Sequence, residues 1–283
     1  MKNVFKTYLL IGALSALLLI IGSVIGGQAG LITALIFSLI FNVISLWFSD
    51  KIVLKMYKAQ QIQRGHASGL YELVEKLARK AGLPMPGVYI IPDNAPNAFA
   101  TGRSPKHSAV AATQGLVDAL SKDEIEAVIA HEVTHIKNRD TLVGTFAAVI
   151  ASAIVHLAMI AKWGMIFGGF SRDNDDNRGG GLFSTILMII LAPLAAALIQ
   201  SAISRSREYM ADKGSKGLMG TGTPLANALR KIDGLSKRGL HMHNASTETA
   251  HMFIMNPISG GSLLSLFMTH PATEDRIKRL MEV

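Results

Sequence analysis

The feature that most constrains this chain is where its charged residues are missing. No charged side chain occurs from Thr7 to Ser49, and two further stretches, Thr141–Ala161 and Gly179–Ser204, also lack charge. A helix that spans a membrane needs roughly 20 mostly apolar residues. The first stretch is therefore long enough for two spans, and each of the others for one. The predicted membrane helices cover residues 8–27, 30–49, 142–161 and 182–204.

Composition supports an integral membrane protein. Only 17% of the 283 residues are charged, whereas soluble domains carry about 25%. The mean hydropathy is +0.34. Within the first apolar stretch, "GGQAG" (Gly26–Gly30) predicts the tight turn of a helical hairpin.

Two other interpretations of these segments were weighed. Lys2 and Lys6 precede an apolar core, as in a cleavable signal peptide, but the weak "GQA" site and the second apolar run argue against cleavage. The last two segments could instead form a buried helix pair in a soluble core. They are less purely apolar than the first two, because they contain His156, Pro193 and Gln200.

The basic residues predict the orientation in the membrane. They flank the predicted spans at Lys2, Lys6, Lys51, Lys55, Lys58, Arg64, Lys137, Arg139, Arg205 and Arg207. By the positive-inside rule, both termini and the soluble blocks are cytoplasmic. Four parts follow: a membrane hairpin (1–50), a cytoplasmic part (51–140), a second membrane hairpin (141–204) and a second cytoplasmic part (205–283).

Charge and cysteine content exclude some kinds of function. The net charge of +8 is explained by topology and by attraction to lipid, and no nucleic-acid-binding motif is present, so we expect no nucleic acid partner. No cysteine occurs, which removes disulfides and thiolate metal sites. Any zinc must be held by histidine and carboxylate.

The soluble blocks predict a mostly α fold with a small β-sheet. Helices are expected in 66–84, from Ser121 onward, in 204–219, in 223–238 and in 271–283. A strand is expected at 87–91, and a short hairpin at 97–113 around "GRSPKH". Ser121 and Glu124 form a predicted capping box. Residues 239–262 show no period and predict a mobile loop.

The segment "AHEVTHIKN" contains the strongest functional signal. His131 and His135 are four residues apart on a predicted helix, so both imidazoles can bind one ion. Glu132 follows the first ligand and can deprotonate a water at the metal. The alternative is that two solvated histidines lie beside an acid.

A catalytic zinc usually takes three protein ligands. His135 lies seven residues before Leu142, and Glu208 lies four after Ser204, so continuous helices place both near one membrane face. Asp212 shares the helix face of Glu208 and can orient a ligating imidazole. The alternative is that Glu208 and Asp212 are a solvated acidic pair that forms ion pairs with nearby basic residues. Competing ligands are His241, His243, Glu248 and His251.

These residues resemble the HtpX-type membrane zinc metalloproteases, gluzincins related to the CAAX prenyl proteases. The resemblance covers essentially the whole chain, through "NAFATG", "HEVTH", "SREYMAD" and "THPATEDRI". It implies an α+β gluzincin-like catalytic domain and one Zn²⁺ per chain, on His131, His135 and Glu208. It also implies Glu132 as general base, with Asp212 supporting a zinc-bound histidine.

The resemblance implies further roles. The stretch Asn97, Ala98, Phe99 and Ala100 corresponds to the strand beside the bound peptide, and His270 to a residue near the reacting carbonyl. The implied setting is a bacterial inner membrane, where the enzyme cuts unfolded or damaged membrane proteins in a stress response. The non-enzymatic alternative is a zinc-stabilised membrane scaffold or small transport protein, for which His156 would be the best feature. Glu132 favours the enzyme, because a structural zinc site needs no base.

Overall fold

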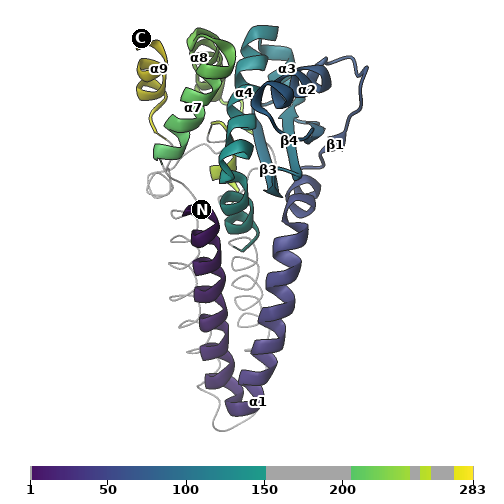
Figure 1. Cartoon of the computed structure of the whole chain (residues 1–283), viewed down its shortest axis with the longest axis vertical. Helices are drawn as coiled ribbons and strands as arrows, with labels where there is room; N and C mark the ends of the chain where they lie inside the picture. The colour runs from purple at the N-terminus through teal and green to yellow at the C-terminus, as the bar shows by residue number, and fades with distance from the viewer. Residues whose placement is uncertain (1, 151–204, 243–248, 256–270, 283) are drawn as a thin grey trace.

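The computed structural model of the chain describes residues 2–150, 205–242, 249–255 and 271–282. Figure 1 shows a globular part of helices with a small sheet, from which the two long arms of α1 extend. The predicted span 182–204, and residues 151–161 of the third span, lie outside the described residues. The predicted second membrane hairpin is therefore described only in its first residues.

The N-terminal helix α1 (Lys2–Met56) folds back on itself. Asn42 Nδ2 donates a hydrogen bond to Ser15 Oγ at 2.9 Å, although a straight helix would separate residues 27 apart by about 40 Å. The reversal lies at Gly27, whose φ of 56° falls in the left-handed region that glycine adopts without a steric penalty. α1 begins and ends on the side of the globular part (Figure 1), so the turn predicted at Gly26–Gly30 is confirmed.

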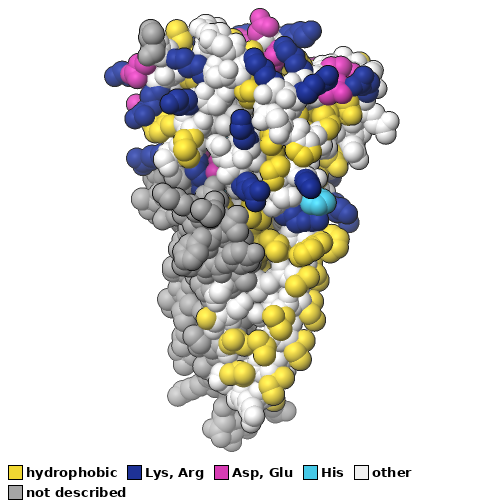
Figure 2. Space-filling view, in the orientation of Figure 1, with side chains coloured by type: hydrophobic (Ala, Val, Ile, Leu, Met, Phe, Trp, Pro, Cys, Tyr) yellow, Lys and Arg dark blue, Asp and Glu magenta, His cyan; other side chains and the backbone are white. Residues whose placement is uncertain are grey.

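One part of α1 is suited to crossing a membrane by length and composition. Gly27–Met56 has a mean hydropathy of 2.3 and is the one such helix in the described ranges. Its large apolar side chains are exposed, at Leu31, Ile32, Leu35, Ile36, Phe37, Leu39, Ile40, Val43, Ile44, Trp47 and Phe48. Figure 2 shows them as a column of hydrophobic atoms below the charged globular part. Contact with lipid accounts for this exposure.

The sheet has four strands in the order β1-β2-β4-β3. They are β1 (Gln60–Gln61), β2 (Gly87–Ile91), β3 (Ala98–Ser104) and β4 (His107–Thr113). β2 and β4 run parallel, while the other two pairs are antiparallel. The predicted strand and hairpin are confirmed, whereas β1 was not predicted. β3 lies at the edge of the sheet.

Both faces of the sheet are covered, because alternate side chains of a strand point to opposite faces. One face contributes to the main core beneath the helices α2 (Leu70–Ala81), α4 (Lys122–Asn138) and α8 (Thr223–Lys237). Its residues are Val88, Ile90, Ala98, Ala100, Val110 and Ala112. The other face contributes Ile91, Phe99, Ala109 and Ala111 to a second core. That core contains the end of α1 and part of the segment Thr249–Met255.

The helices other than α1 make up the rest of the globular part (Figure 1). They are α2 (Leu70–Ala81), α3 (Gln114–Ala119), α4 (Lys122–Asn138), the helix Asp140–Ile150, α7 (Arg205–Met219), α8 (Thr223–Lys237), η1 (Ala250–Met252) and α9 (Thr273–Met281). The helices predicted in the soluble blocks are confirmed, and α3 was not predicted. The described chain is thus mostly helical with a small mixed sheet.

The prediction of a mobile loop at 239–262 is wrong for residues 249–255, which the structure describes. Thr249, Phe253 and Ile254 are each 1% exposed or less. Ile254 N donates to Ala98 O at 3.0 Å, which attaches this segment to the edge of β3. Its order comes from contacts with residues about 150 positions earlier, and a local sequence pattern does not record such contacts.

Candidate active site

Helix α4 carries the two histidines through the centre of the globular part. Ser121 Oγ accepts from Glu124 N at 3.4 Å and Glu124 Oε2 accepts from Ser121 N at 2.8 Å, so the predicted capping box is confirmed. Val128, Ile129 and Val133 are fully buried in the main core. This packing fixes the rotation of α4 about its axis. His131 and His135 consequently face α7.

A close approach between α4 and α7 brings in the acidic residue. A Cβ atom at Gly214 would lie 2.3 Å from Thr134 Cγ2, so only glycine allows this separation of the helices. One residue on, Ser215 Oγ donates to Ala127 O at 2.7 Å. The two contacts hold the helices side by side. Glu208, two turns earlier on α7, is thereby placed opposite the histidines.

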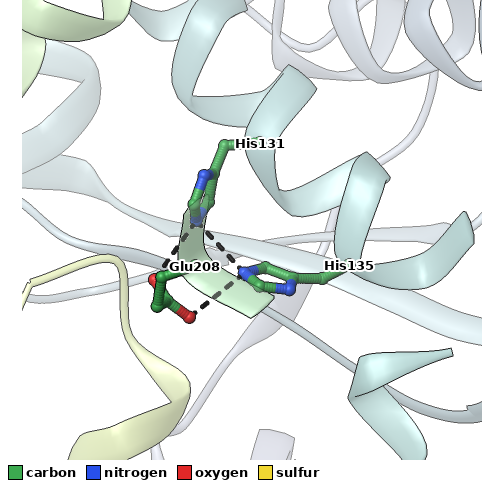
Figure 3. A group of neighbouring side chains, drawn as sticks. All are labelled: His131, His135 and Glu208. Atoms are coloured by element: carbon green, nitrogen blue, oxygen red, sulfur yellow. Dashed lines mark hydrogen bonds and ion pairs between the residues drawn. The ribbon is translucent and has the colours of Figure 1, made fainter. Parts of the chain in front are cut away.

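The structure brings His131, His135 and Glu208 together in the one group of potential metal ligands found in the described part of the chain. The two Nε2 atoms lie 3.1 Å apart (Figure 3). Glu208 Oε2 lies 3.7 Å from His131 Nε2, and Glu208 Oε1 lies 3.5 Å from His135 Nε2. Ligands around a tetrahedral zinc at about 2.0–2.1 Å are themselves about 3.3 Å apart, so this spacing fits the ion.

The outer nitrogen of each ring has its own carboxylate. His131 Nδ1 lies 3.0 Å from Asp212 Oδ1, and His135 Nδ1 lies 3.0 Å from Asp140 Oδ2. A carboxylate at Nδ1 favours the proton there and leaves the lone pair on Nε2. Both Nε2 atoms are then directed at one point, where a metal cation can accept their lone pairs. The donor set therefore fits a zinc ion in chemistry as well as in spacing.

Asp212 belongs to a buried ion pair that joins two helices. Arg276 of α9 donates to both carboxylate oxygens of Asp212, from Nε at 3.0 Å and from Nη2 at 2.7 Å. Its Nη1 donates to Ile254 O at 2.8 Å. Arg276 is 1% exposed, so these bonds replace its lost hydration. Burial opposes ionisation of Asp212, but Arg276 and His131 outweigh it and lower its pKa to about 2.

The titratable groups at the centre are shifted by burial and by one another. Burial lowers the pKa of His131, although the neighbouring Asp212 partly opposes the shift. Burial also disfavours the charged form of His135, but Asp140 and Glu208 outweigh it and raise its pKa to about 9. Burial raises the pKa of Glu132 to about 7, with His135 opposing. A general base works best with a pKa near the operating pH, and Glu132 meets that condition.

A cleft opens beside these residues. Its walls come from α4, α7, β3, the helix Asp140–Ile150 and the segment Thr249–Met255. The lining residues are Ala100, His131, Glu132, His135, Asp140, Thr141, Gly144, Thr145, Arg207, Glu208, His251, Met252, Phe253 and Ile254. The predicted metal ligands and the predicted base thus share one cavity with one residue of the predicted substrate strand.

The first residues of the predicted substrate strand are paired within the chain. Ala98 O accepts from Ile254 N at 3.0 Å. Asn97 is 3% exposed, and its Nδ2 donates to Met255 O at 3.0 Å. A peptide that paired along these residues would have to replace those bonds.

The next residues of the strand differ from each other. Phe99 is fully buried, and its ring lies 5.1 Å from that of Phe253 and 5.8 Å from that of Tyr57, between centroids. Ala100 lines the cleft, and a backbone hydrogen bond from Ala100 contributes to the environment of Glu132. Among the four strand residues predicted to bind substrate, Ala100 is the one at the cavity.

The other predicted residues lie elsewhere or outside the described ranges. His270, His243 and Glu248 belong to the parts of the chain that are not described, as does His156. His241 is half-buried, with Nδ1 3.5 Å from Ser236 Oγ. His251 lines the cleft, with Nε2 3.0 Å from Gly144 O.

Three residues of the site were not singled out from the sequence. Asp140 lies two residues beyond the end of α4, and Arg139 in the left-handed conformation (φ 58°) turns it back toward His135. Arg276 stands in "THPATEDRI", of which only His270 was given a role. Arg207 was assigned to membrane topology and, in the alternative interpretation, to ion pairs with Glu208 and Asp212 at the surface. Among these three, Asp140 had the clearest sequence signal, because it is a carboxylate five residues after the predicted ligand His135.

Comparison with known proteins gives consistent matches. The family model "Peptidase family M48" matches residues 66–283. The chain is 52% identical over 280 residues to the "Protease HtpX homolog" of Desulfatibacillum aliphaticivorans, covering 99% of this chain and 89% of that one. It is 51% identical to the protein of that name from Pyrococcus furiosus, covering 98% of this chain and 95% of that one.

A solved structure has a similar fold. The crystal structure of S. mikatae Ste24p matches with a TM-score of 0.53 and 22% sequence identity. The match covers 99% of this chain but 64% of Ste24p, which is the longer protein. At this identity the similarity concerns the fold alone.

Proposed function

Because this chain belongs to peptidase family M48 and is a metalloprotease, we propose that it cuts unfolded or damaged membrane proteins by means of one zinc ion. The ligands in this proposal are His131, His135 and Glu208, with Glu132 as general base. The observation that carries the proposal is the convergence of both Nε2 atoms and the Glu208 carboxylate, with their ligand atoms within 4.8 Å of one another.

The family also decides between the two classes of function predicted from the sequence. The relatives of about 50% identity over the full chain are named as proteases, which confirms an enzyme rather than a zinc-stabilised scaffold or transport protein. The buried Glu132 agrees with this, because a structural metal site has no use for a base beside its ligands.

The mechanism assigns a task to each residue. A zinc ion bound here would polarise the scissile carbonyl and lower the pKa of a water to about 7. Glu132 accepts the proton of the attacking water and then transfers it to the nitrogen of the leaving amine, so the C–N bond breaks without releasing an amide anion. Asp212 and Asp140 hold the two imidazoles in the orientation required for ligation.

Substrate enters along β3 in this proposal. An extended peptide that pairs with a strand edge is held by main-chain hydrogen bonds, which tolerate many sequences. Ala100 offers the pairing position at the cavity, and Asn97, Ala98 and Phe99 extend the same edge once residues 253–255 give way. His270 supplies a second donor to the oxyanion. His270→Ala should then keep zinc and KM while kcat falls by about 10²–10³; unchanged kcat would remove this role.

The membrane setting in this proposal is a multi-pass inner-membrane protein with four spans and a cytoplasmic catalytic part. The apolar surface of Gly27–Met56 and the basic residues Lys51 and Lys55 at its C-terminal end support it. A reporter fused after Asp50 or at Val283 should behave as cytoplasmic, and one placed within 168–178 as periplasmic. A cytoplasmic signal from 168–178 would remove the second hairpin.

The test of the activity uses purified protein in detergent. Wild type and Glu132→Ala are each incubated with an unfolded membrane protein, with zinc or with a chelator. Cleavage should require both zinc and Glu132. Zinc-independent cleavage, or equal cleavage by Glu132→Ala, would contradict the proposed mechanism.

A further inference from the structure

The cleft contains a buried cation that the mechanism above does not use. Arg207 lines the same cavity as the metal ligands and is 6% exposed. Its Nη1 and Nη2 atoms are both buried and have no hydrogen-bond partner anywhere in the described ranges. A guanidinium offers five donors in a planar fork, and burying them unpaired is costly.

The second buried arginine of the site provides a comparison. Arg276 has hydrogen bonds to both oxygens of Asp212 and to Ile254 O, so its fork is occupied within the chain. Arg207 is buried nearly as deeply, yet its two terminal nitrogens face no such acceptor. The same fold thus gives every nitrogen of one guanidinium an acceptor and leaves both terminal nitrogens of the other, which lines the cavity, without one in the described ranges.

The nearest carboxylates are already engaged. Burial lowers the pKa of Arg207, and attraction to Asp140 and Glu208 offsets this effect only in part. Asp140 lies against His135 Nδ1, and Glu208 faces both histidines. Neither carboxylate can turn to Arg207 without leaving the metal site. Within the described ranges, the acceptor for Arg207 is left to a molecule that enters the cleft.

We propose that Arg207 is a substrate-binding residue that holds a carboxylate of the peptide in the cleft beside the metal site. Two free nitrogens at one end of a planar fork match the two oxygens of a carboxylate, whereas a single amide carbonyl would occupy only one of them. A carboxylate also supplies the negative charge that would neutralise the buried guanidinium of Arg207. This inference rests on the proposed function, because it assigns a substrate preference to that same site.

Two parts of a peptide can supply this carboxylate. One is an aspartate or glutamate side chain close to the bond that is cut, and the other is the chain's own C-terminus. The recognition chemistry is the same in both cases. Peptides that differ in only one of these groups distinguish them.

The experiment measures binding without turnover. Zinc-loaded Glu132→Gln protein in detergent is titrated with labelled, otherwise uncharged peptides, in which one Glu or its Gln counterpart moves along the sequence. A second pair differs only in a C-terminal acid or amide. The same titrations are made with two double variants, in which Arg207→Gln or Arg205→Gln is combined with Glu132→Gln. Arg205→Gln is the matched control, since Arg205 is an exposed arginine of the same helix.

The expected result is a preference of about tenfold or more for the carboxylate member of one pair, which a charge-assisted bidentate bond supplies. Arg207→Gln should abolish this preference, and Arg205→Gln should keep it. Equal binding of both members of every pair, or a preference that survives Arg207→Gln, would overturn the proposal. Because no turnover is needed, an inactive wild type would count against the proposed function and not against this inference.

Thermal unfolding of the substrate-free protein gives an independent readout. If Arg207 has no partner within the chain, Arg207→Gln should unfold at the wild-type temperature or above it, with its zinc retained. A large drop would reveal a structural partner and overturn the proposal. Should Arg207→Gln fail to accumulate, Arg207→Lys keeps the charge without the fork and should reduce the preference several-fold; an unchanged preference would again overturn the proposal.

Discussion

The two histidines of the site are held in different ways, although their spacing on α4 is regular. His131 is 1% exposed and rests against Asp212, which is itself bonded to the buried Arg276 of α9. The side chain of His135 is 14% exposed, and its carboxylate partner, Asp140, lies only five residues farther along the chain. One histidine is positioned by helices distant in sequence, and the other by a local turn.

Because of this difference, the two sides contribute differently to the stability of the fold and to metal binding. The Asp212–Arg276 pair ties α7 to α9, so the His131 side contributes to the stability of the whole catalytic part. The Asp140 contact follows directly from the end of α4, so it orients the His135 ring and favours its charged form without joining distant helices. Glu208 faces both histidines and belongs to both sides. Changes on the two sides should therefore have different consequences.

The largest effect is expected where the two sides meet. Glu208→Ala removes one of the three proposed ligands, so the protein should lose its zinc together with all measurable cleavage. His131→Ala and His135→Ala should behave in the same way. Metal content after gel filtration, measured beside activity, checks this. Stoichiometric zinc with near-normal activity in Glu208→Ala would move the third ligand elsewhere, first to Glu248.

The next effect separates chemistry from binding. Glu132→Gln should keep zinc and substrate affinity but lose turnover by about 10²–10⁴, because the base handles protons and is no ligand. Zinc content and kcat of the same preparation provide the measurement. Loss of zinc in Glu132→Gln would show that this residue also holds the metal.

The direct comparison of the two sides uses a matched pair of variants. Asp212→Asn and Asp140→Asn should each weaken zinc binding about 10- to 100-fold. Asp212→Asn should lower the stability of the metal-free protein more than Asp140→Asn does, by about 3–5 kcal/mol, because Arg276 is left buried beside a neutral amide. Chelator competition and thermal unfolding measure the two effects. Equal stability losses in both variants would remove the distinction drawn here.

The smallest effect is on the pH dependence of stability without metal. The pKa of His135 is raised to about 9, so its charged form stabilises the metal-free fold fully below about pH 6.5, and this contribution is lost as the pH rises through 9. Unfolding temperature should thus fall from pH 6.5 to 9. His135→Gln should flatten that part of the curve. A wild-type curve that rises over this interval would contradict the assignment.

Local patterns predicted much of the fold and the centre of the site. The capping box at Ser121, the helix that follows it and the spacing of His131 and His135 depend on residues within four positions of one another. The turn near Gly27 was visible because charge is absent on both sides of it. Such features are recorded in short stretches of sequence.

The remainder depends on contacts between distant residues. Arg276 meets Asp212 across 64 positions, and the segment 249–255 gains its structure by pairing with β3. The stretch 239–262 that contains this segment is rich in Gly, Ser, His and Met and has no period from which the pairing could be inferred. Asp140 is local, but Arg139 ends the helix in the left-handed conformation, so helical periodicity places the carboxylate on the wrong face.

X-ray absorption at the zinc edge tests the central claim most directly, because it reports the ligands themselves. For the zinc-loaded protein we expect two imidazole nitrogens at about 2.0–2.1 Å and oxygen ligands at about 2.0–2.2 Å, without sulfur. A third imidazole in the wild-type spectrum, from His241, His243 or His251, or a sulfur ligand, would contradict the assignment of zinc to His131, His135 and Glu208.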